Sequence, residues 1–306
     1  MKRVIGLSAL LVIYAMAFTV GIFSFMLFER LGLNDYISVL LADVIATVIV
    51  WASGVILRTA SAYDPYWSLQ TLAIYICLLY KNQNWHVGTI LLLVVISLYS
   101  FRLTLNFILG FHSLSYVDWR YKMLKEKTGK FYQVVNLFGI CMFPTLVVYA
   151  ASLPVMAYAS IQTFSAFDII GLSVIVLGIL LELIADIQMK KFVKNRSDRS
   201  QVLDKGLWRY SRHPNYLGEI SIWFGVALTL IISHFNYWFF IAGAVINLLM
   251  FLFISIPMEE KHFKEYKPDY EQYKNDTSML LILPKKKQSL AKNSVCSLKR
   301  YIIYRF

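Results

Sequence analysis

The sequence predicts an all-α fold: a polytopic integral membrane helical bundle of about seven to eight transmembrane helices. Hydrophobic residues make up 58% of the 306-residue chain and charged residues only 16%, whereas soluble domains average about 45–50% and about 25%. The hydrophobic residues also form long blocks, and a helix needs roughly 20 of them to cross the hydrocarbon core. The net charge of +12 gathers between particular blocks, as in cytoplasmic loops of membrane proteins.

Eight apolar blocks give the predicted spans. The first follows Lys2 and Arg3, but it is too long for the apolar core of a signal peptide and lacks a small-residue cleavage site. The third is short, and the last two form a hairpin across a very short turn. The eight blocks are residues 4–28, 36–57, 66–80, 87–109, 134–158, 169–189, 217–233 and 237–257.

The distribution of basic residues predicts the topology. Lysine and arginine collect in residues 116–130, in 190–212 and after 257, and are almost absent from 83–86, 160–168 and 234–236. Short basic loops stay on the cytoplasmic side, so eight spans place both termini in the cytoplasm, in a bacterial inner membrane or the endoplasmic reticulum. Topology thus explains the charge, and we expect membrane lipids rather than nucleic acid as partners.

The chain is predicted to hold one transmembrane domain, residues 1–284, and a basic tail, residues 285–306. The tail begins with three lysines, and it either lies against anionic headgroups or is solvated. The three cysteines have no spacing typical of metal ligands, so no metal site is expected.

Ionisable residues within the spans are the first candidates for function, because each costs a few kcal/mol at membrane depth. Asp43 lies in the second span and Arg102 in the fourth. Glu182 and Asp186 lie four residues apart, on one face of the sixth span. Alternatively, Asp186 lies at headgroup level and Glu182 pairs with Arg102.

Two further candidates are Asp64 and Tyr99. Pro65 keeps Asp64 out of helical geometry, so its carboxyl group either caps the third span or points into a cavity. Tyr99 precedes Arg102 by three residues, on the same helical face. An aromatic residue at this spacing is usually a packing residue, but the neighbouring arginine favours a site.

Residues 205–219, KGLWRYSRHPNYLGE, form the segment richest in chemical groups. Arginine can contact phosphate through two parallel bonds, and aromatic rings can stack on a base. The alternative is an amphipathic interfacial loop. A second polar cluster follows the last span and is expected to fold back as a lid over this loop. The candidates from the two segments are Trp208, Tyr210, Arg212, His213, Asn215, Tyr216, Glu219, Glu260, His262 and Tyr270, with Lys190 at the start of the basic stretch.

The stretch LWRYSRHPNYLGE, with the aspartate before it and the Glu-Glu and tyrosine residues after the hairpin, resembles the C-terminal half of the steroid 5α-reductase family. Within that family, the stretch is most similar to an uncharacterised bacterial branch, which is described only as a domain of unknown function. The resemblance covers about residues 64–284. It implies a helical membrane bundle that holds NADPH in a cytosol-facing cavity and reduces a carbon–carbon double bond conjugated to a carbonyl.

The resemblance also implies roles for single residues. Asn215, Glu219 and Asp186 match residues that contact the cofactor, whereas Glu182 stands where the reductases have asparagine. Tyr99 and Arg102 resemble a tyrosine-x-x-arginine pair whose tyrosine donates to the substrate carbonyl, and Asp64 falls near a glutamate that serves the same carbonyl. Tyr99 and Asp64 are therefore the expected catalytic residues, and the expected cofactor-binding residues are Arg102, Glu182, Asp186, Lys190, Trp208, Tyr210, Arg212, His213, Asn215, Tyr216, Glu219, Glu260, His262 and Tyr270.

The same Arg-His-Pro-x-Tyr core also resembles isoprenylcysteine carboxyl methyltransferases and phospholipid methyltransferases, which bind S-adenosylmethionine. The arginine-rich loop of eukaryotic reductases has no counterpart at residues 110–116, GFHSLSY, so the substrate is open between steroid-like and isoprenoid-like molecules. The sequence has no G-x-G-x-x-G or Walker A motif. The leading hypothesis is an NADPH-dependent reductase whose lipophilic substrate enters from the bilayer. The alternatives are an S-adenosylmethionine-dependent methyltransferase and a non-enzymatic membrane or assembly protein.

Overall fold

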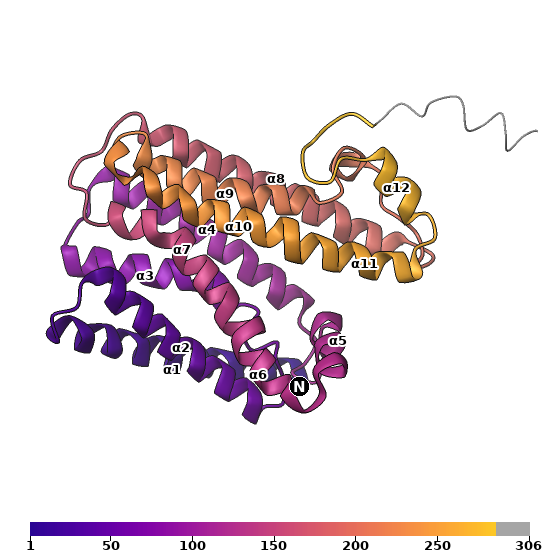
Figure 1. The fold of residues 1–306 in the computed structure, drawn as a ribbon, viewed down its shortest axis with the longest axis horizontal. Helices are drawn as coiled ribbons and strands as arrows, with labels where there is room; N and C mark the ends of the chain where they lie inside the picture. The colour runs from indigo at the N-terminus through magenta and orange to yellow at the C-terminus, as the bar shows by residue number, and fades with distance from the viewer. Residues whose placement is uncertain (286–306) are drawn as a thin grey trace, which may run out of the picture. The chain divides into compact units, whose positions relative to one another are not determined.

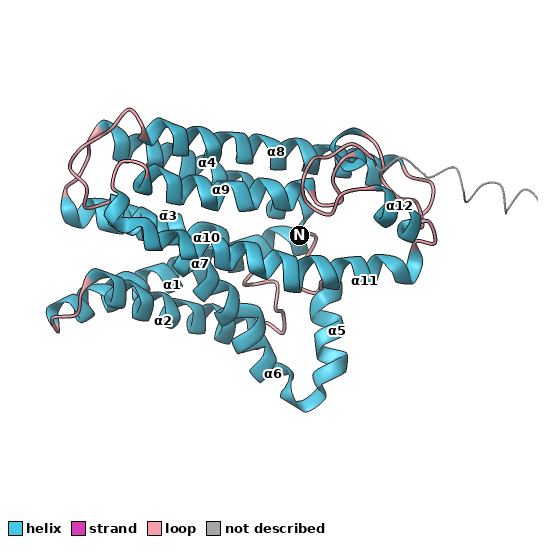
Figure 2. Cartoon of the chain, turned by 45° about the horizontal axis from the view of Figure 1, so that its top comes forward, coloured by secondary structure: helices cyan, strands magenta, loops and turns pink. Residues whose placement is uncertain are grey.

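The computed structural model describes residues 1–285, which form helices joined by loops, without a strand in that range (Figures 1 and 2). Six helical stretches in it are long and apolar enough to cross a membrane. These are Lys2–Arg30, Asp35–Ile56, Val87–Gly110, Trp119–Tyr158, Asp168–Asn195 and Phe235–Tyr266. The predicted all-α polytopic membrane fold is confirmed.

The third and seventh predicted spans are also helical, although neither is among these six. Helix α3 (Tyr66–Asn82) has 17 residues and α9 (Pro214–Ile231) has 18, against the roughly 20 that a span needs. The number of crossings and the cytoplasmic location of both termini stay predictions. The expected tail lies outside the described residues, apart from Lys285.

Contacts between residues divide the chain into two compact units. The first comprises residues 1–179 and 219–250, and the second comprises residues 180–218 and those from 251 onward. Helices α8 (Asp168–Asn195) and α9 each contribute residues to both units. That residues 1–284 form a single domain stays a prediction.

The first unit contains a helical pair, α1 (Lys2–Arg30) and α2 (Asp35–Ile56), which lie side by side (Figure 1). The side chain of Asn34 caps α2 by accepting a hydrogen bond from the amide of Ile37 at 3.0 Å. Helices α3, α4 (Val87–Gly110) and α7 (Phe143–Tyr158) build the core with the later part of α9. Fully buried side chains of this core include Tyr75, Leu79, Val155 and Trp223.

Helices α7 and α10 (Ile241–Met250) pack closely against each other, at a glycine of α10 and next to a proline of α7. Pro154 lies inside α7 and cannot donate to the carbonyl of Ala150, four residues earlier. A Cβ atom at Gly243 of α10 would lie only 2.0 Å from that carbonyl oxygen. The glycine therefore lets the two backbones pack together in the first unit.

Two π-helical segments interrupt the long helices. In the first unit, α5 (Trp119–Thr128) and the short α6 (Tyr132–Val135) lead into η2 (Asn136–Met142). In the second unit, η5 (Phe251–Ser255) leads into α11 (Ile256–Tyr266). Each segment ends just before a proline, Pro144 or Pro257. The carbonyl four residues before a proline clashes with its ring in a regular α-helix, and in both cases that carbonyl lies within the π-helical turn.

The second unit holds the loop that follows α8. Gly206, with φ +61°, begins a short turn, Gly206–Arg209, and a Cβ atom there would collide with Gln188. The side chain of Gln188 accepts from the amide of Leu207 at 2.9 Å, and the indole of Trp208 donates to the carbonyl of Ala185 at 3.1 Å. The loop is thereby fastened to α8. Helices α11 and α12 (Tyr270–Asp276) complete the unit.

Candidate functional site

In the first unit, three side chains form a buried group that we call the phenol cluster: Tyr99, Glu219 and Trp223. Tyr99 lies midway along α4 and is 2% exposed. Its hydroxyl donates to Oε1 of Glu219 at 2.6 Å, and the indole of Trp223 donates to the same oxygen at 2.8 Å. The rings of Tyr99 and Trp223 meet edge to face at 5.8 Å. The phenol is therefore fixed by a hydrogen bond and by a ring contact.

Asp64 has a different partner. It lies in the loop between α2 and α3 and accepts a hydrogen bond from the hydroxyl of Tyr121 in α5. Burial raises the pKa of Asp64 to about 6, although this hydrogen bond and the charge of Arg120 act in the opposite direction. The carboxyl group found beside Tyr99 is thus Glu219, and support of Tyr99 by Asp64 stays a prediction.

The remaining predicted residues of the long helices differ in burial. Arg102 in α4 is 9% exposed and Glu182 in α8 is 6% exposed, so both charged groups are withdrawn from lipid and water. Asp186 is half-buried and Lys190 is exposed, one and two turns further along α8. Lys190 thus presents its charge at the surface of the second unit.

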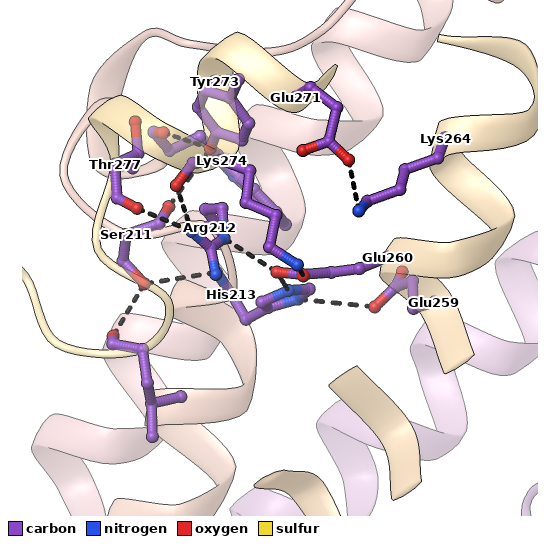
Figure 3. Close-up of polar contacts among 12 residues, drawn as sticks. Ser211, Arg212, His213, Glu259, Glu260, Lys264, Glu271, Tyr273, Lys274 and Thr277 are labelled. Atoms are coloured by element: carbon purple, nitrogen blue, oxygen red, sulfur yellow. Dashed lines mark hydrogen bonds and ion pairs between the residues drawn. The ribbon is translucent and has the colours of Figure 1, made fainter. Parts of the chain in front are cut away.

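In the second unit, Arg212 is the centre of what we call the charge cluster: Arg212, His213, Glu259, Glu260 and Lys274 (Figure 3). The guanidinium is 8% exposed, and its Nε donates to Oε1 of Glu260 at 2.8 Å. Its Nη1 donates to the carbonyls of Lys274 and Thr277. The ammonium of Lys274 lies 2.7 Å from the second oxygen of Glu260, so one buried carboxylate meets two cations.

His213 lies between two carboxylates of α11. Its Nδ1 is 3.5 Å from Glu259 and its Nε2 is 3.4 Å from Glu260, while its ring stacks on Tyr216 at 5.3 Å. Burial lowers the pKa of His213, but the hydrogen bonds and charges of the two glutamates outweigh it and raise the pKa above its usual value. The two carboxylates therefore stabilise the protonated imidazolium relative to the neutral ring.

These contacts fasten the C-terminal segment to the loop, as the sequence predicted for a lid. The amide of Arg212 donates to the carbonyl of Ser278 at 2.9 Å, and the hydroxyl of Ser211 donates to the carbonyl of Leu280 at 2.7 Å. The contacts also limit the phosphate-binding role expected of Arg212. Its Nε and Nη1 donors are used within the unit, which leaves its Nη2 group for a ligand.

The other residues predicted for the loop and lid are placed as follows. The carboxamide oxygen of Asn215 is buried and has no hydrogen-bond partner among residues 1–285, and the same holds for the hydroxyl of Tyr270. Tyr210 is 40% exposed. His262 lies 3.3 Å from Glu265 of its own helix and packs on Tyr266.

Three residues that the sequence does not single out lie in direct contact with predicted ones: Trp223, Lys274 and Tyr121. Trp223 follows Glu219 by one helical turn, and that spacing was the available signal. Glu259, the first residue of the Glu-Glu pair, is half-buried, and its contact with His213 is seen only in the folded chain. Tyr121 lies 57 residues from Asp64, and Lys274 lies on a different helix from Glu260, so only the tertiary fold reveals these two contacts.

Comparison with known proteins gives one family match and one distant relative. Residues 50–277, well over half of the chain, match the model of a family described as "Protein of unknown function (DUF1295)". An uncharacterised protein of the fission yeast Schizosaccharomyces pombe is 25% identical over 218 residues. The similarity covers 62% of this chain and 63% of the yeast protein, less than two thirds of that relative's length. No solved structure matches.

Proposed function

The chain belongs to the DUF1295 family, and from this premise we propose that it is a membrane-bound, NADPH-dependent reductase of a carbon–carbon double bond conjugated to a carbonyl. The observation that carries the proposal is the hydrogen bond from Tyr99 to Glu219 in the interior of an apolar helical bundle. The resemblance of residues 207–219 to the steroid 5α-reductases supports it.

Tyr99 supplies the electrophilic contact. When bound, NADPH supplies a hydride for the carbon β to the carbonyl, and negative charge then develops on the carbonyl oxygen. Tyr99 Oη donates a hydrogen bond to that oxygen, and such preorganised donors are effective where water is excluded. Glu219 and Trp223 hold the ring in one orientation, and the hydroxyl donates to the substrate oxygen once its bond to Glu219 opens or reverses its polarity.

The residues near the start of α9 fit the cofactor's amide. The buried oxygen of Asn215 has no hydrogen-bond donor among the described residues, and a buried acceptor left without one costs about 1–3 kcal/mol. The carboxamide of a nicotinamide ring supplies such a donor. For the phosphates, we propose the exposed cations Lys190, Arg199 and Arg209 rather than Arg212, because their charges are not already buried in an ion pair.

The substrate is proposed to be a lipophilic enone, steroid- or isoprenoid-like, that enters from the bilayer. The unit that holds Tyr99 consists of apolar helices with many exposed large hydrophobic side chains, so the medium around it is lipid. A polar substrate would have to leave water to reach the phenol, whereas a lipophilic one is already dissolved in that medium.

Mass spectrometry of the protein after gentle detergent extraction tests the cofactor. We expect NADPH or NADP to copurify, and the purified protein to oxidise added NADPH when a lipophilic enone is present. Copurified S-adenosylmethionine, with methyl transfer to a lipid acceptor, would replace the reductase by the methyltransferase. If the folded protein bound neither cofactor, both the reductase and the methyltransferase would be contradicted.

A further inference from the structure

A groove in the first unit lies between α1, α2 and α3, and its lining includes no residue of the phenol cluster. Its walls are apolar and include Phe18, Ile22, Val39, Ala42, Ala46 and Ile74, and its volume is about 60 Å³. Ile22 is 49% exposed, so the groove is open on the α1 side. Because α1 and α2 are long and apolar enough to cross a membrane, the medium outside that opening is lipid.

Two of the residues that line the groove, Asp43 and Gln70, carry buried polar groups, which lipid-facing walls do not explain. Asp43, 6% exposed, accepts from the hydroxyl of Tyr66 at 2.9 Å and from the amide of Gln70 at 2.6 Å. The same amide nitrogen donates to the carbonyl of Thr145 at 3.1 Å. Gln70 is 1% exposed, and its Oε1 is a buried acceptor with no hydrogen-bond partner among the described residues.

The missing group is therefore a hydrogen-bond donor attached to an apolar chain. The donors of Tyr66 and Gln70 are used on Asp43 and on the carbonyl of Thr145, so neither supplies the donor that Gln70 Oε1 lacks. A volume of about 60 Å³ is well below the roughly 150 Å³ of a cavity that binds benzene, so it admits the end of a linear chain and not a ring. Polar residues at membrane depth are functional by default.

We propose that this groove binds a long-chain primary alcohol from the bilayer, whose hydroxyl donates to Gln70 Oε1 while the first carbons of its chain lie between α1, α2 and α3. The walls from α1 and α2 come from residues before 50, and the family match covers residues 50–277. The site therefore draws on a part of the chain outside the matched region. The inference does not rest on the reductase activity.

Photolabelling tests the site on the full-length protein in nanodiscs. The probe is a hexadecan-1-ol that carries a diazirine near its hydroxyl end, and labelled peptides are identified by mass spectrometry. We expect labels on α1, α2 and α3 at the groove, and competition by unlabelled hexadecan-1-ol. Its methyl ether, which cannot donate, should compete about 2-fold to 10-fold less well, the range for one hydrogen bond. Cholesterol, whose hydroxyl is borne on a ring system, should not compete.

Two variants and a matched control sharpen the test. Gln70→Met removes the acceptor at similar length and should make the alcohol and its ether equivalent competitors. Gly21 lines the groove, so Gly21→Ala should narrow it and reduce labelling. The fold should tolerate the added carbon, because it makes only ordinary contacts at 3.6 Å or more. Gly110→Ala is the control, because a Cβ atom there meets nothing within 4 Å.

Three outcomes would overturn the proposal. One is labelling spread evenly over the lipid-facing helices, another is equal competition by alcohol and ether on the unmodified protein, and the third is competition by cholesterol as strong as that of the alcohol. If Gln70→Met does not fold, the comparison of alcohol and ether on the unmodified protein still decides. No readout depends on NADPH, so failure here leaves the reductase proposal standing.

Discussion

The hydroxyl of Tyr99 donates a hydrogen bond of 2.6 Å to Glu219, a residue 120 positions later in the chain. Both side chains are almost fully buried, in the part of the first unit where α4 and α9 contribute to one core. A phenol has one hydrogen to donate, and in this structure it is given to a carboxylate. Donation to a substrate oxygen would therefore require the Tyr99–Glu219 bond to open or to reverse its polarity.

Replacing Tyr99 with phenylalanine tests the electrophilic role. Tyr99→Phe keeps the ring and its packing, and we expect turnover to fall roughly 10²–10³-fold, as when other enzymes lose such a donor, while NADPH affinity stays near normal. The matched control is Tyr75→Phe, which deletes another buried hydroxyl of the same core, bonded to the carbonyl of Thr89 at 3.1 Å. Equal turnover in the two variants would exclude the mechanism.

The pair of Arg212 and Glu260 predicts a stability effect in the second unit. Removing one member of a buried ion pair typically costs about 3–5 kcal/mol, so Arg212→Ala should release the segment from α11 to residue 285 and expose it to protease. Arg212→Lys should recover only part of the protease resistance, because lysine cannot reproduce the guanidinium contacts.

The double variant Arg212→Met with Glu260→Met should be more resistant to protease than either single methionine variant. A resistant Arg212→Ala protein with tenfold weaker cofactor binding would instead restore the phosphate role.

His213 makes the attachment of this segment dependent on pH. Its folded pKa lies above the unfolded value of 6.5, so the folded state binds the proton more tightly. The stabilisation is fully present below about pH 6.5 and is lost as pH rises through the folded pKa. Amide hydrogen exchange of α11 and α12, corrected for intrinsic rates, should therefore accelerate on going to alkaline pH. His213→Gln should abolish this dependence, and His262→Gln, whose partner is a surface glutamate, should keep it.

Reporter fusions test the predicted topology. Fusions after Asn195 and after Lys285 should report the cytoplasm, and a fusion at Thr163 should report the opposite side, because basic loops are retained inside. Asn195 ends α8, and Thr163 lies in the loop between α7 and α8. An external signal at Asn195 would place Lys190 and the charge cluster on the side that lacks the cytosolic cofactor.

Hydropathy located the helices well, since the cost of leaving lipid-exposed backbone without hydrogen bonds forces apolar blocks into helices. It was weakest for α3 and α9, which are short and carry polar residues such as Gln70 and Glu219. The site was predicted less completely. Arg212 was interpreted as a ligand contact, because a sequence shows which donors exist and not which are satisfied internally. Its partner Glu260 lies 48 residues away, and only the folded chain brings the two together.

The π-helical segment before Pro144 has a consequence for the evolution of this chain. Deleting one residue from a regular helix turns everything after it by about 100°, which would move Thr145 away from Thr47 and Tyr63, its hydrogen-bond partners. A π-helical turn holds one residue more per hydrogen-bonded ring than an α-helical turn. A deletion within Asn136–Met142 can therefore be absorbed by conversion to an α-helical turn. Homologues that differ in length by one residue are expected to differ here.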